Sequence, residues 1–373
     1  MTGGSAGSGG VGGSGGSAGS GGIGGDGGSG GVAGEGGSGG SAGSGGSAGS
    51  GGVAMFIAQG HAGRTTISCD DGRTWVADQS DEAGEYCPPN GENSCDHGPG
   101  AARGITWGDG WFFATFGWGA EGSIVRSLDG VLWTSIYDGG QFGGVAYGNG
   151  RLVAAHRWGD YSDDDDRSIW SGFSGVDLPA TNVRDVAFVP YGGGRFIMSS
   201  DAGVVVSSDG STWNQPQSIP GSCTGGEYQG RITYGNGTIV MTPGSGNVCS
   251  STDGGQTWTL ASLPTGLRSN GIWNGSEFMA WNYGTLYRSS DGQNWTSTST
   301  VPNDVDFGVA AVSDQGTIVG VSNRWGESYG AERFYRSEDG VNWEELSSGA
   351  YTGGHPIRAM TFGYGQSSAS CPP

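Results

Sequence analysis

Three segments of the sequence place a tryptophan-glycine pair among acidic residues. They are FGWGAEGS (116–123), HRWGDYSDDDDRS (156–168) and NRWGESYGAE (323–332). An indole ring stacks on apolar C–H faces and carboxylates accept hydrogen bonds from hydroxyl groups, a combination that suits sugar binding. The candidate ligand-binding residues of these segments are Trp118, Trp158, Trp325, Glu121, Asp160 and Glu327. The alternative is that the three indoles pack as ordinary structural residues.

Arginines at a shared spacing form a second candidate site. Three of them stand four residues before an aromatic residue of a predicted strand: Arg103, Arg184 and Arg358, before Trp107, Phe188 and Phe362. Arg231 and Arg268 are within one residue of the same spacing. A guanidinium binds a carboxylate through two parallel hydrogen bonds, so gathered arginines would hold an anionic ligand. The alternative is structural pairing with nearby carboxylates such as Asp185.

An acidic run at 163–166 offers the hard oxygen ligands that calcium prefers. The candidate calcium ligands are Asp160, Asp163, Asp164 and Asp165. The alternative is a solvated loop. No other cofactor is indicated, because the four histidines have no spacing typical of a metal site.

The charge of the chain limits its partners. Of 373 residues, 36 are acidic and 16 are basic, all of them arginine, which gives a formal net charge of −20. Nucleic acids and anionic membrane surfaces need a positive footprint, so we expect neither as a partner. No apolar run is long enough to span a membrane.

Residues 1–52 are almost wholly Gly, Ser and Ala, which predicts a flexible low-complexity linker. Most aromatic residues fall in 53–373, which predicts one folded domain there. The six cysteines have no zinc-like spacing and indicate disulfides, and hence an extracellular or cell-surface protein. The linker also fits a lipoprotein whose leader has been removed, with Met1 standing where a lipidated cysteine would be and a lipid anchor upstream.

An acidic turn motif, as in RSSDGQNW (288–295), recurs along residues 53–373. Its six aspartates are Asp70, Asp129, Asp209, Asp253, Asp291 and Asp339. The gap between the second and third copies is about double the smaller gaps, and the segment 167–178 fills it as a degenerate copy. Seven units with a period of roughly 40–50 residues are typical of propeller blades.

Each unit has the same order of predicted strands. A strand ending in an aromatic residue and glycine, such as ITWGDG (105–110), precedes an apolar strand. A third strand runs into the acidic turn, and the tryptophan of the turn opens a fourth, which predicts four-stranded antiparallel blades. Residues from Val53 match a second strand, whereas 357–365 match a first. We therefore expect a seven-bladed all-β propeller closed by a composite blade from both termini.

The repeat resembles the Asp-box (BNR) family, found in sialidases, family 74 xyloglucanases and many bacterial surface proteins. Two copies fit its S-x-D-x-G-x-T-W pattern residue for residue: Ser68, Asp70, Gly72, Thr74 and Trp75, and Ser251, Asp253, Gly255, Thr257 and Trp258. The resemblance covers residues 53–373. It implies that the turns lie on the face opposite the ligand site.

The acidic turns themselves have a structural interpretation. The carboxylate and the serine hydroxyl accept hydrogen bonds from turn amides, the glycine allows a positive φ, and the tryptophan packs between sheets. The alternative is a set of calcium or sugar sites, but the flanking residues supply no further ligand groups.

The map of strands also predicts the disulfides. Cys69 and Cys371 meet at the closure of the ring, and Cys223 and Cys249 lie on one face. Cys87 and Cys95 then pair across a small loop.

The leading function is a non-catalytic, monomeric, exported ligand-binding protein, with a glycan as the leading ligand. The first alternative is a sialidase-like glycoside hydrolase acting at the mouth of the channel. Against it, the Arg-Ile-Pro segment of sialidases is missing, and no nucleophile pair stands out. The second alternative is a protein-interaction scaffold.

Overall fold

The computed structural model describes residues 52–60, 65–75, 101–117, 122–138, 142–156, 161–164, 183–200, 203–215, 219–223, 230–243, 247–261, 271–282, 285–298, 307–322, 333–346, 357–368 and 371. All of them lie in one compact unit, Ala33–Pro373. The predicted linker, residues 1–52, falls outside the described residues except for Gly52.

The described residues form seven antiparallel sheets, four of them with four strands each. The first comprises β3 (Ala101–Gly108), β4 (Trp111–Gly117), β5 (Ser123–Ser127) and β6 (Trp133–Asp138). The second comprises β13 (Gly230–Gly235), β14 (Thr238–Pro243), β15 (Cys249–Ser251) and β16 (Thr259–Leu260). The third comprises β17 (Ile272–Trp273), β18 (Phe278–Asn282), β19 (Thr285–Ser289) and β20 (Thr296–Thr298). The fourth comprises β21 (Phe307–Val312), β22 (Ile318–Ser322), β23 (Arg333–Ser337) and β24 (Glu344–Glu345).

The other three sheets have three strands each within the described residues. One comprises β7 (Phe142–Gly148), β8 (Arg151–His156) and β9 (Tyr161–Asp164). Another comprises β10 (Val183–Val189), β11 (Arg195–Ser200) and β12 (Gly203–Ser207). The last joins β1 (Val53–Gly60) and β2 (Thr65–Ser68) to β25 (Ile357–Gly365). Two short 3₁₀ turns, η2 (Tyr191–Gly193) and η3 (Gly221–Cys223), lie between strands.

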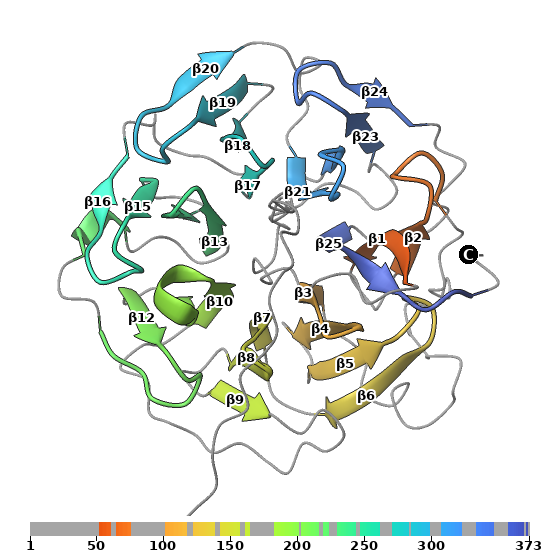
Figure 1. The fold of residues 1–373 in the computed structure, drawn as a ribbon, viewed down its shortest axis with the longest axis horizontal. Helices are drawn as coiled ribbons and strands as arrows, with labels where there is room; N and C mark the ends of the chain where they lie inside the picture. Colours follow the sequence, from red (N-terminus) through yellow and green to blue (C-terminus); the bar gives the residue numbers. More distant parts are fainter. Residues whose placement is uncertain are drawn as a thin grey trace, which may run out of the picture. The chain divides into compact units, whose positions relative to one another are not determined.

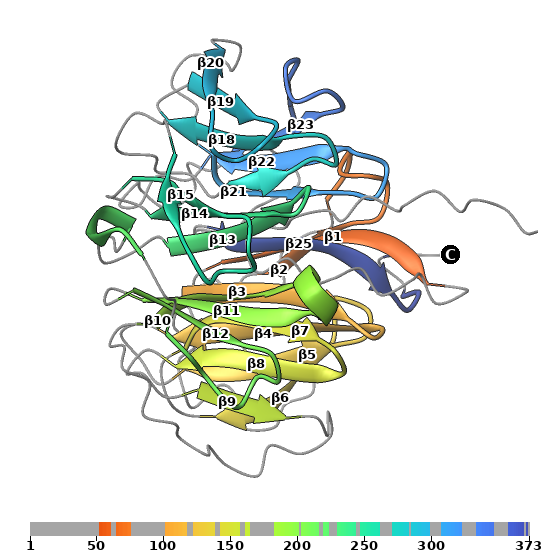
Figure 2. The ribbon, with the colours of Figure 1, turned by 60° about the vertical axis from the view of Figure 1, so that its left-hand side comes forward.

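One edge strand of each sheet lies nearest the centre (Figure 1), and these inner strands are β25, β3, β7, β10, β13, β17 and β21. Each inner strand contacts the inner strand of the next sheet, and β21 contacts β25, so the contacts close a ring. Figure 2 shows β3, β4, β5 and β6 following one another outward from the centre. This arrangement is a β-propeller of antiparallel blades.

The ring closes through the pairing of the two ends of the folded region. β25 pairs along its length with β1, from Val53 opposite Gly365 to Gly60 opposite Ile357. The composite sheet expected from the sequence is therefore present. The ring therefore cannot open at this sheet unless the hydrogen bonds between β1 and β25 break.

A glycine at or near the end of an inner strand lies against an aromatic ring of the next blade. A methyl group on Gly148 would lie 2.1 Å from the ring of Phe188, and one on Gly108 would lie 2.1 Å from Tyr147. The same relation joins two further pairs, Gly235 with Trp273 and Gly363 with Trp107. Neighbouring sheets pack this closely only because the glycines lack side chains, which explains the aromatic-glycine spacing of the repeat.

The core is divided among the boundaries between sheets. For example, Trp133 packs with Met55 and Ile67 of the composite sheet and with Phe112 of its own. Trp258 likewise packs with Ile197 of the preceding sheet and with residues of its own. Each tryptophan of an acidic turn therefore fills the space between two blades, as predicted for an apolar wedge.

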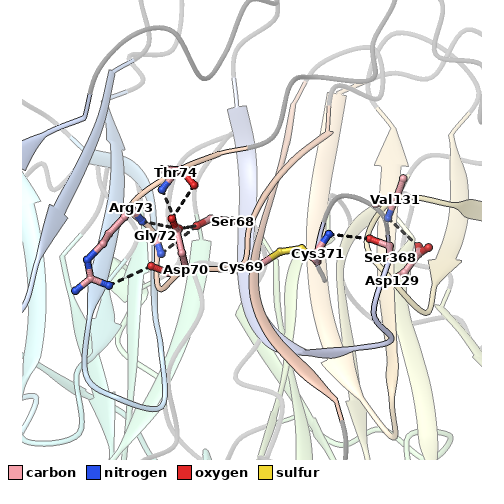
Figure 3. The surroundings of a disulfide bond; sticks show 10 residues. All are labelled: Ser68, Cys69, Asp70, Gly72, Arg73, Thr74, Asp129, Val131, Ser368 and Cys371. Atoms are coloured by element: carbon pink, nitrogen blue, oxygen red, sulfur yellow. Dashed lines mark hydrogen bonds between the residues drawn. A yellow bond between two sulfur atoms is a disulfide. The ribbon is translucent and has the colours of Figure 1, made fainter. Parts of the chain in front are cut away.

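Two disulfides lie among the described residues, and both are predicted pairs. Cys69 and Cys371 have Cα atoms 5.7 Å apart and join the turn after β2 to the segment after β25 (Figure 3). Cys223 and Cys249 have Cα atoms 5.8 Å apart. Near the first bond, the amide of Gln366 donates to the carbonyl of Leu128 at 2.7 Å, so the segment after β25 is tied to two neighbouring blades. The predicted pair Cys87–Cys95 lies outside the described residues.

One sequence prediction about the degenerate unit was wrong in part. Asp163 and Asp164, predicted in a loop, belong to β9, where they pair with Val153 and Leu152 of β8. The segment 167–178, predicted to hold the degenerate copy of the acidic turn, lies outside the described residues. Backbone pairing with β8 outweighed the polarity of the run.

Candidate functional site

The order of strands gives the ring two different ends. In every sheet but the composite one, the chain enters along the inner strand, and the strands then alternate in direction; in the composite sheet, β25 is the inner strand and pairs antiparallel with β1. The acidic turns, between third and fourth strands, therefore lie at one end, which we call the turn end. The inner strands begin at the other, which we call the entry end. Residues near the start of the inner strands thus gather at the entry end, away from the acidic turns.

Three of the predicted arginines occupy the same irregular position at the entry end. Arg103 is skipped in the pairing of β3 with β4, because Ala102 and Gly104 lie opposite consecutive residues. Arg184 is skipped in the same way in β10, and Arg358 in β25. A β-bulge bends the strand and redirects the side chain of the extra residue. We call Arg103, Arg184 and Arg358 the bulge arginines; the side chain of Arg184 lies outside the described residues.

The bulge arginines lie on neighbouring parts of the ring. β25 contacts β3, β3 contacts β7, and β7 contacts β10. β7 has a bulge of its own, where Gly143 and Gly144 pass opposite a single residue. A methyl group on Gly104 would lie 2.9 Å from the Cα atom of Gly144, so the inner strands approach backbone to backbone here.

Arg231 extends this series to the next inner strand. It lies on β13, which contacts β10, and its Nη1 is 3.5 Å from Oδ1 of Asp185. Asp185 follows Arg184 on β10 and is completely buried. The expected alternative, pairing of an arginine with Asp185, therefore holds for Arg231. We call the bulge arginines together with Arg231 the arginine arc.

Asp185 joins three inner strands. Its Oδ2 accepts a hydrogen bond from the amide of Ile232 on β13 at 3.0 Å. On the other side it rests against β7, since a methyl group on Gly144 would lie 2.3 Å from Oδ1. Burial raises the pKa of the Asp185 carboxyl to about 6, although the charge of Arg231 and the amides of Ile232 and Val186 act in the opposite direction.

The carboxylates at the turn end differ from Asp185, because hydrogen bonds from their own turns stabilise the charged form. In the turn after β23, Oδ1 of Asp339 accepts the amides of Val341 and Asn342 at 2.8 and 2.7 Å, and Ser337 Oγ accepts the amide of Gly340 at 2.8 Å. These hydrogen bonds, with that of Asn342 the strongest, lower the pKa of Asp339 to about 2. The described turns at Asp70, Asp129, Asp209, Asp253 and Asp291 accept amides in the same way. In each of these turns, Oδ1 of the carboxylate is thus engaged by the turn itself.

The candidates from the tryptophan-containing segments cannot be placed in this site. Trp118, Trp158, Trp325, Glu121, Asp160 and Glu327 lie outside the described residues, as do Asp165 and Arg268. Only the backbone of Asp163 and Asp164 is described. Among the side chains that the structure does describe, no group of three His, Cys, Asp or Glu is arranged to hold a metal ion. No helix in the described part of the chain is long and apolar enough to cross a membrane.

Sequence reasoning missed two features of the entry end. The first is the set of β-bulges, which no sequence pattern predicts directly. The only sequence signal that accompanies them is the shared spacing of the three arginines. Asp185 appeared only as a structural partner. Asp185 and Arg231 each stand three residues before an aromatic residue, Phe188 and Tyr234. This equal spacing places them at the same level of neighbouring inner strands and could have predicted that they lie close together.

No protein-family model matches the chain, and no curated protein sequence matches it. Among solved structures, it is similar to virginiamycin B lyase from Staphylococcus aureus, with a TM-score of 0.52 and 13% identity over 70% of this chain and 94% of that one. It is similar to AztD from Citrobacter koseri, with a TM-score of 0.51 and 11% identity over 85% and 99% of the two chains. For YCF48 bound to a D1 peptide the values are 0.49 and 12%, over 85% and 95%. At such identities the likeness to virginiamycin B lyase and AztD shows the β-propeller fold alone.

Proposed function

We propose that the chain is a ligand-binding β-propeller whose site is the entry end of the ring, and that the ligand carries a negative charge. The observation that carries the proposal is the repeated bulge that holds an arginine at the start of β25, β3 and β10. In a chain with a net charge of −20 and no lysine, four of only 16 basic residues belong to the arginine arc. This concentration of positive charge at one end of the ring supports a binding role for the arc beyond the pairing of Arg231 with Asp185.

The ligand class is a glycan with a carboxylate group. Planar guanidinium groups recognise a carboxylate through paired hydrogen bonds. The inner strands begin at the entry end, where the Trp-Gly segments that connect second to third strands are also expected to lie. Trp118, Trp158 and Trp325 would then supply the stacking surface for sugar rings, with Glu121, Asp160 and Glu327 accepting from hydroxyls.

The turn end is assigned a structural role. We propose that the chain is a seven-bladed member of the Asp-box family and that Asp70, Asp129, Asp209, Asp253, Asp291 and Asp339 brace the blade corners. The amides that each carboxylate accepts support this assignment, since a carboxylate engaged by its own turn has little capacity left for a ligand. The two disulfides agree with an exported, extracellular protein.

A glycan array printed with carboxylate-bearing glycans and their neutral counterparts tests the proposal. We expect binding to the acidic members and weak or no binding to the neutral ones. Turnover of fluorogenic glycosides would instead favour a sialidase-like hydrolase. Silence in both assays would contradict glycan recognition and favour a protein-interaction scaffold.

A further inference from the structure

The carboxylate of Asp185 is the one described acidic side chain that lies within the arginine arc. It is completely buried and has hydrogen-bond partners on a neighbouring strand. Its contacts come from Arg231 and Ile232 on β13, and from Gly144 on β7. The register partner of Asp185 on β11 is Ser199, which is buried and uncharged. Arg231 is thus the charged group that faces Asp185 among the described side chains.

Arg231 lies between solvent and the buried carboxylate of Asp185. Its side chain is 16% exposed, so part of the side chain reaches solvent, while Nη1 lies 3.5 Å from Oδ1 of Asp185. The carboxylate does not depend on Arg231 for its position, because the amide of Ile232 holds Oδ2 at 3.0 Å. Loss of the negative charge would therefore free the guanidinium without displacing Asp185.

We infer that Asp185 is a positioning residue for the arginine arc: when ionised it holds Arg231 against β10, and when protonated it releases Arg231 to an anionic ligand. The inference rests on the proposed function, since it concerns the regulation of the same site. Mildly acidic solution then strengthens binding, because the arc loses a buried negative charge and gains an available guanidinium. Burial of the carboxyl places this change near pH 6. By linkage, ligand binding takes up a proton.

The test is calorimetric titration of the protein with glucuronic acid, with glucose as the neutral control, between pH 5 and pH 7.5. We expect the affinity for glucuronic acid to rise about tenfold from the upper to the lower pH, which corresponds to about one pKa unit of coupling between ligand and carboxyl. Glucuronic acid stays ionised across this range, so its own charge does not change.

Two variants separate positioning from structure. Asp185→Asn keeps the acceptor for the Ile232 amide and is expected to bind at all pH values as the wild type does at pH 5. Arg231→Gln is expected to bind more weakly, with the midpoint of the pH dependence moved upward, because the ionised Asp185 loses the charge that stabilises it. A merely structural pair would change affinity equally at all pH values.

A measurement without ligand distinguishes failure of this inference from failure of the proposed function. The Asp185 carboxyl, observed by ¹³C NMR and assigned with Asp185→Asn, should titrate near pH 6. Binding of glucuronic acid with no dependence on pH would overturn the inference and leave the proposed function intact. No binding at any pH would overturn both. A carboxyl that titrates below pH 4 would overturn the inference whatever the binding data.

Discussion

The backbone carbonyl of Asp71 accepts a hydrogen bond from Nε of Arg336 at 2.8 Å, across the boundary between the composite sheet and the sheet that precedes it in the ring. Nη2 of the same arginine also donates to Oδ2 of Asp71 at 2.8 Å and to Thr317 at 3.2 Å. The side chain of Arg336 is only 7% exposed. A single buried guanidinium therefore fastens the acidic turn of the composite blade to its neighbour.

Replacement of Arg336 tests this fastening. We expect Arg336→Gln to lower the free energy of unfolding by about 3 kcal/mol, because it removes the buried positive charge beside the Asp71 carboxylate and leaves that carboxylate with the hydroxyl of Thr317. The measurement is urea denaturation followed by tryptophan fluorescence. The matched control is Arg333→Gln, which removes an exposed pair with Glu345 and should cost less than about 1 kcal/mol. Equal losses in the free energy of unfolding for the two variants would contradict the role of Arg336 in joining the two blades.

The two disulfides should differ in their contribution to stability. Cys69–Cys371 closes a loop of 302 residues and Cys223–Cys249 one of 26. Chain entropy predicts stabilisation of about 5 to 6 kcal/mol for the first and about 3 to 4 kcal/mol for the second. Double serine variants of each pair, unfolded in urea, measure the difference. A larger loss for the pair Cys223 and Cys249 would argue against the role of the first bond in closing the ring.

Removal of an acidic-turn carboxylate should affect stability and leave binding unchanged. Asp339→Ala leaves the amides of Val341 and Asn342 without their acceptor, and we expect a loss of about 1 to 3 kcal/mol in the free energy of unfolding. Glu344→Ala, an exposed carboxylate five residues away, is the control and should have little effect. Reduced affinity for acidic glycans in Asp339→Ala would indicate a ligand site at the turn end.

Stability should pass through a maximum in mildly acidic solution. The pKa of Asp185 is raised to about 6, so the native state binds more protons than the unfolded state between about pH 4 and pH 6. The free energy of unfolding therefore increases as pH falls through this window, by up to about 3 kcal/mol at about 1.4 kcal/mol per pKa unit. The pKa values of Asp291 and Asp339 are lowered to about 2, so their contribution is lost as pH falls from about 4 towards 2.

Urea unfolding at a series of pH values checks both limbs of this profile. Asp185→Asn should flatten the limb between about pH 4 and pH 6 and leave the acid limb in place. A wild-type profile that falls steadily from pH 7 to pH 4 would contradict the assignment of the Asp185 carboxyl.

Much of the fold could be predicted because each repeat carries its own local signals. The glycine after the aromatic residue, as in Gly148, makes room for a ring of the next blade, and the Asp-Gly pair marks the corner. The strand at Asp163 and Asp164 was not predicted, because an acidic run carries no apolar alternation that would mark it as a strand. The joint between Asp71 and Arg336 could not be predicted, because its partners are 265 residues apart and belong to no shared pattern.

The site was predictable only in part. The common spacing of Arg103, Arg184 and Arg358 pointed to a shared position, but sequence alone does not show that a strand skips a residue. The exposure of Arg231 and the burial of Asp185 depend on how β7, β10 and β13 approach one another. Glycines such as Gly144 allow these strands to come close together. A pattern within one repeat does not show which residues of the next repeat such a glycine will contact.

The central claim is that an anionic ligand binds at the entry end through the arginine arc. Calorimetric titration with glucuronic acid at pH 5, for the wild type and for the double variant Arg103→Gln, Arg358→Gln, tests it most directly. The control for overall charge is the double variant Arg73→Gln, Arg333→Gln, which removes two exposed arginines. We predict a loss of affinity of at least tenfold in the double variant and no more than twofold in the control, since each guanidinium that contacts a carboxylate is worth about 1.5 to 3 kcal/mol. Wild-type affinity in the double variant would contradict the account.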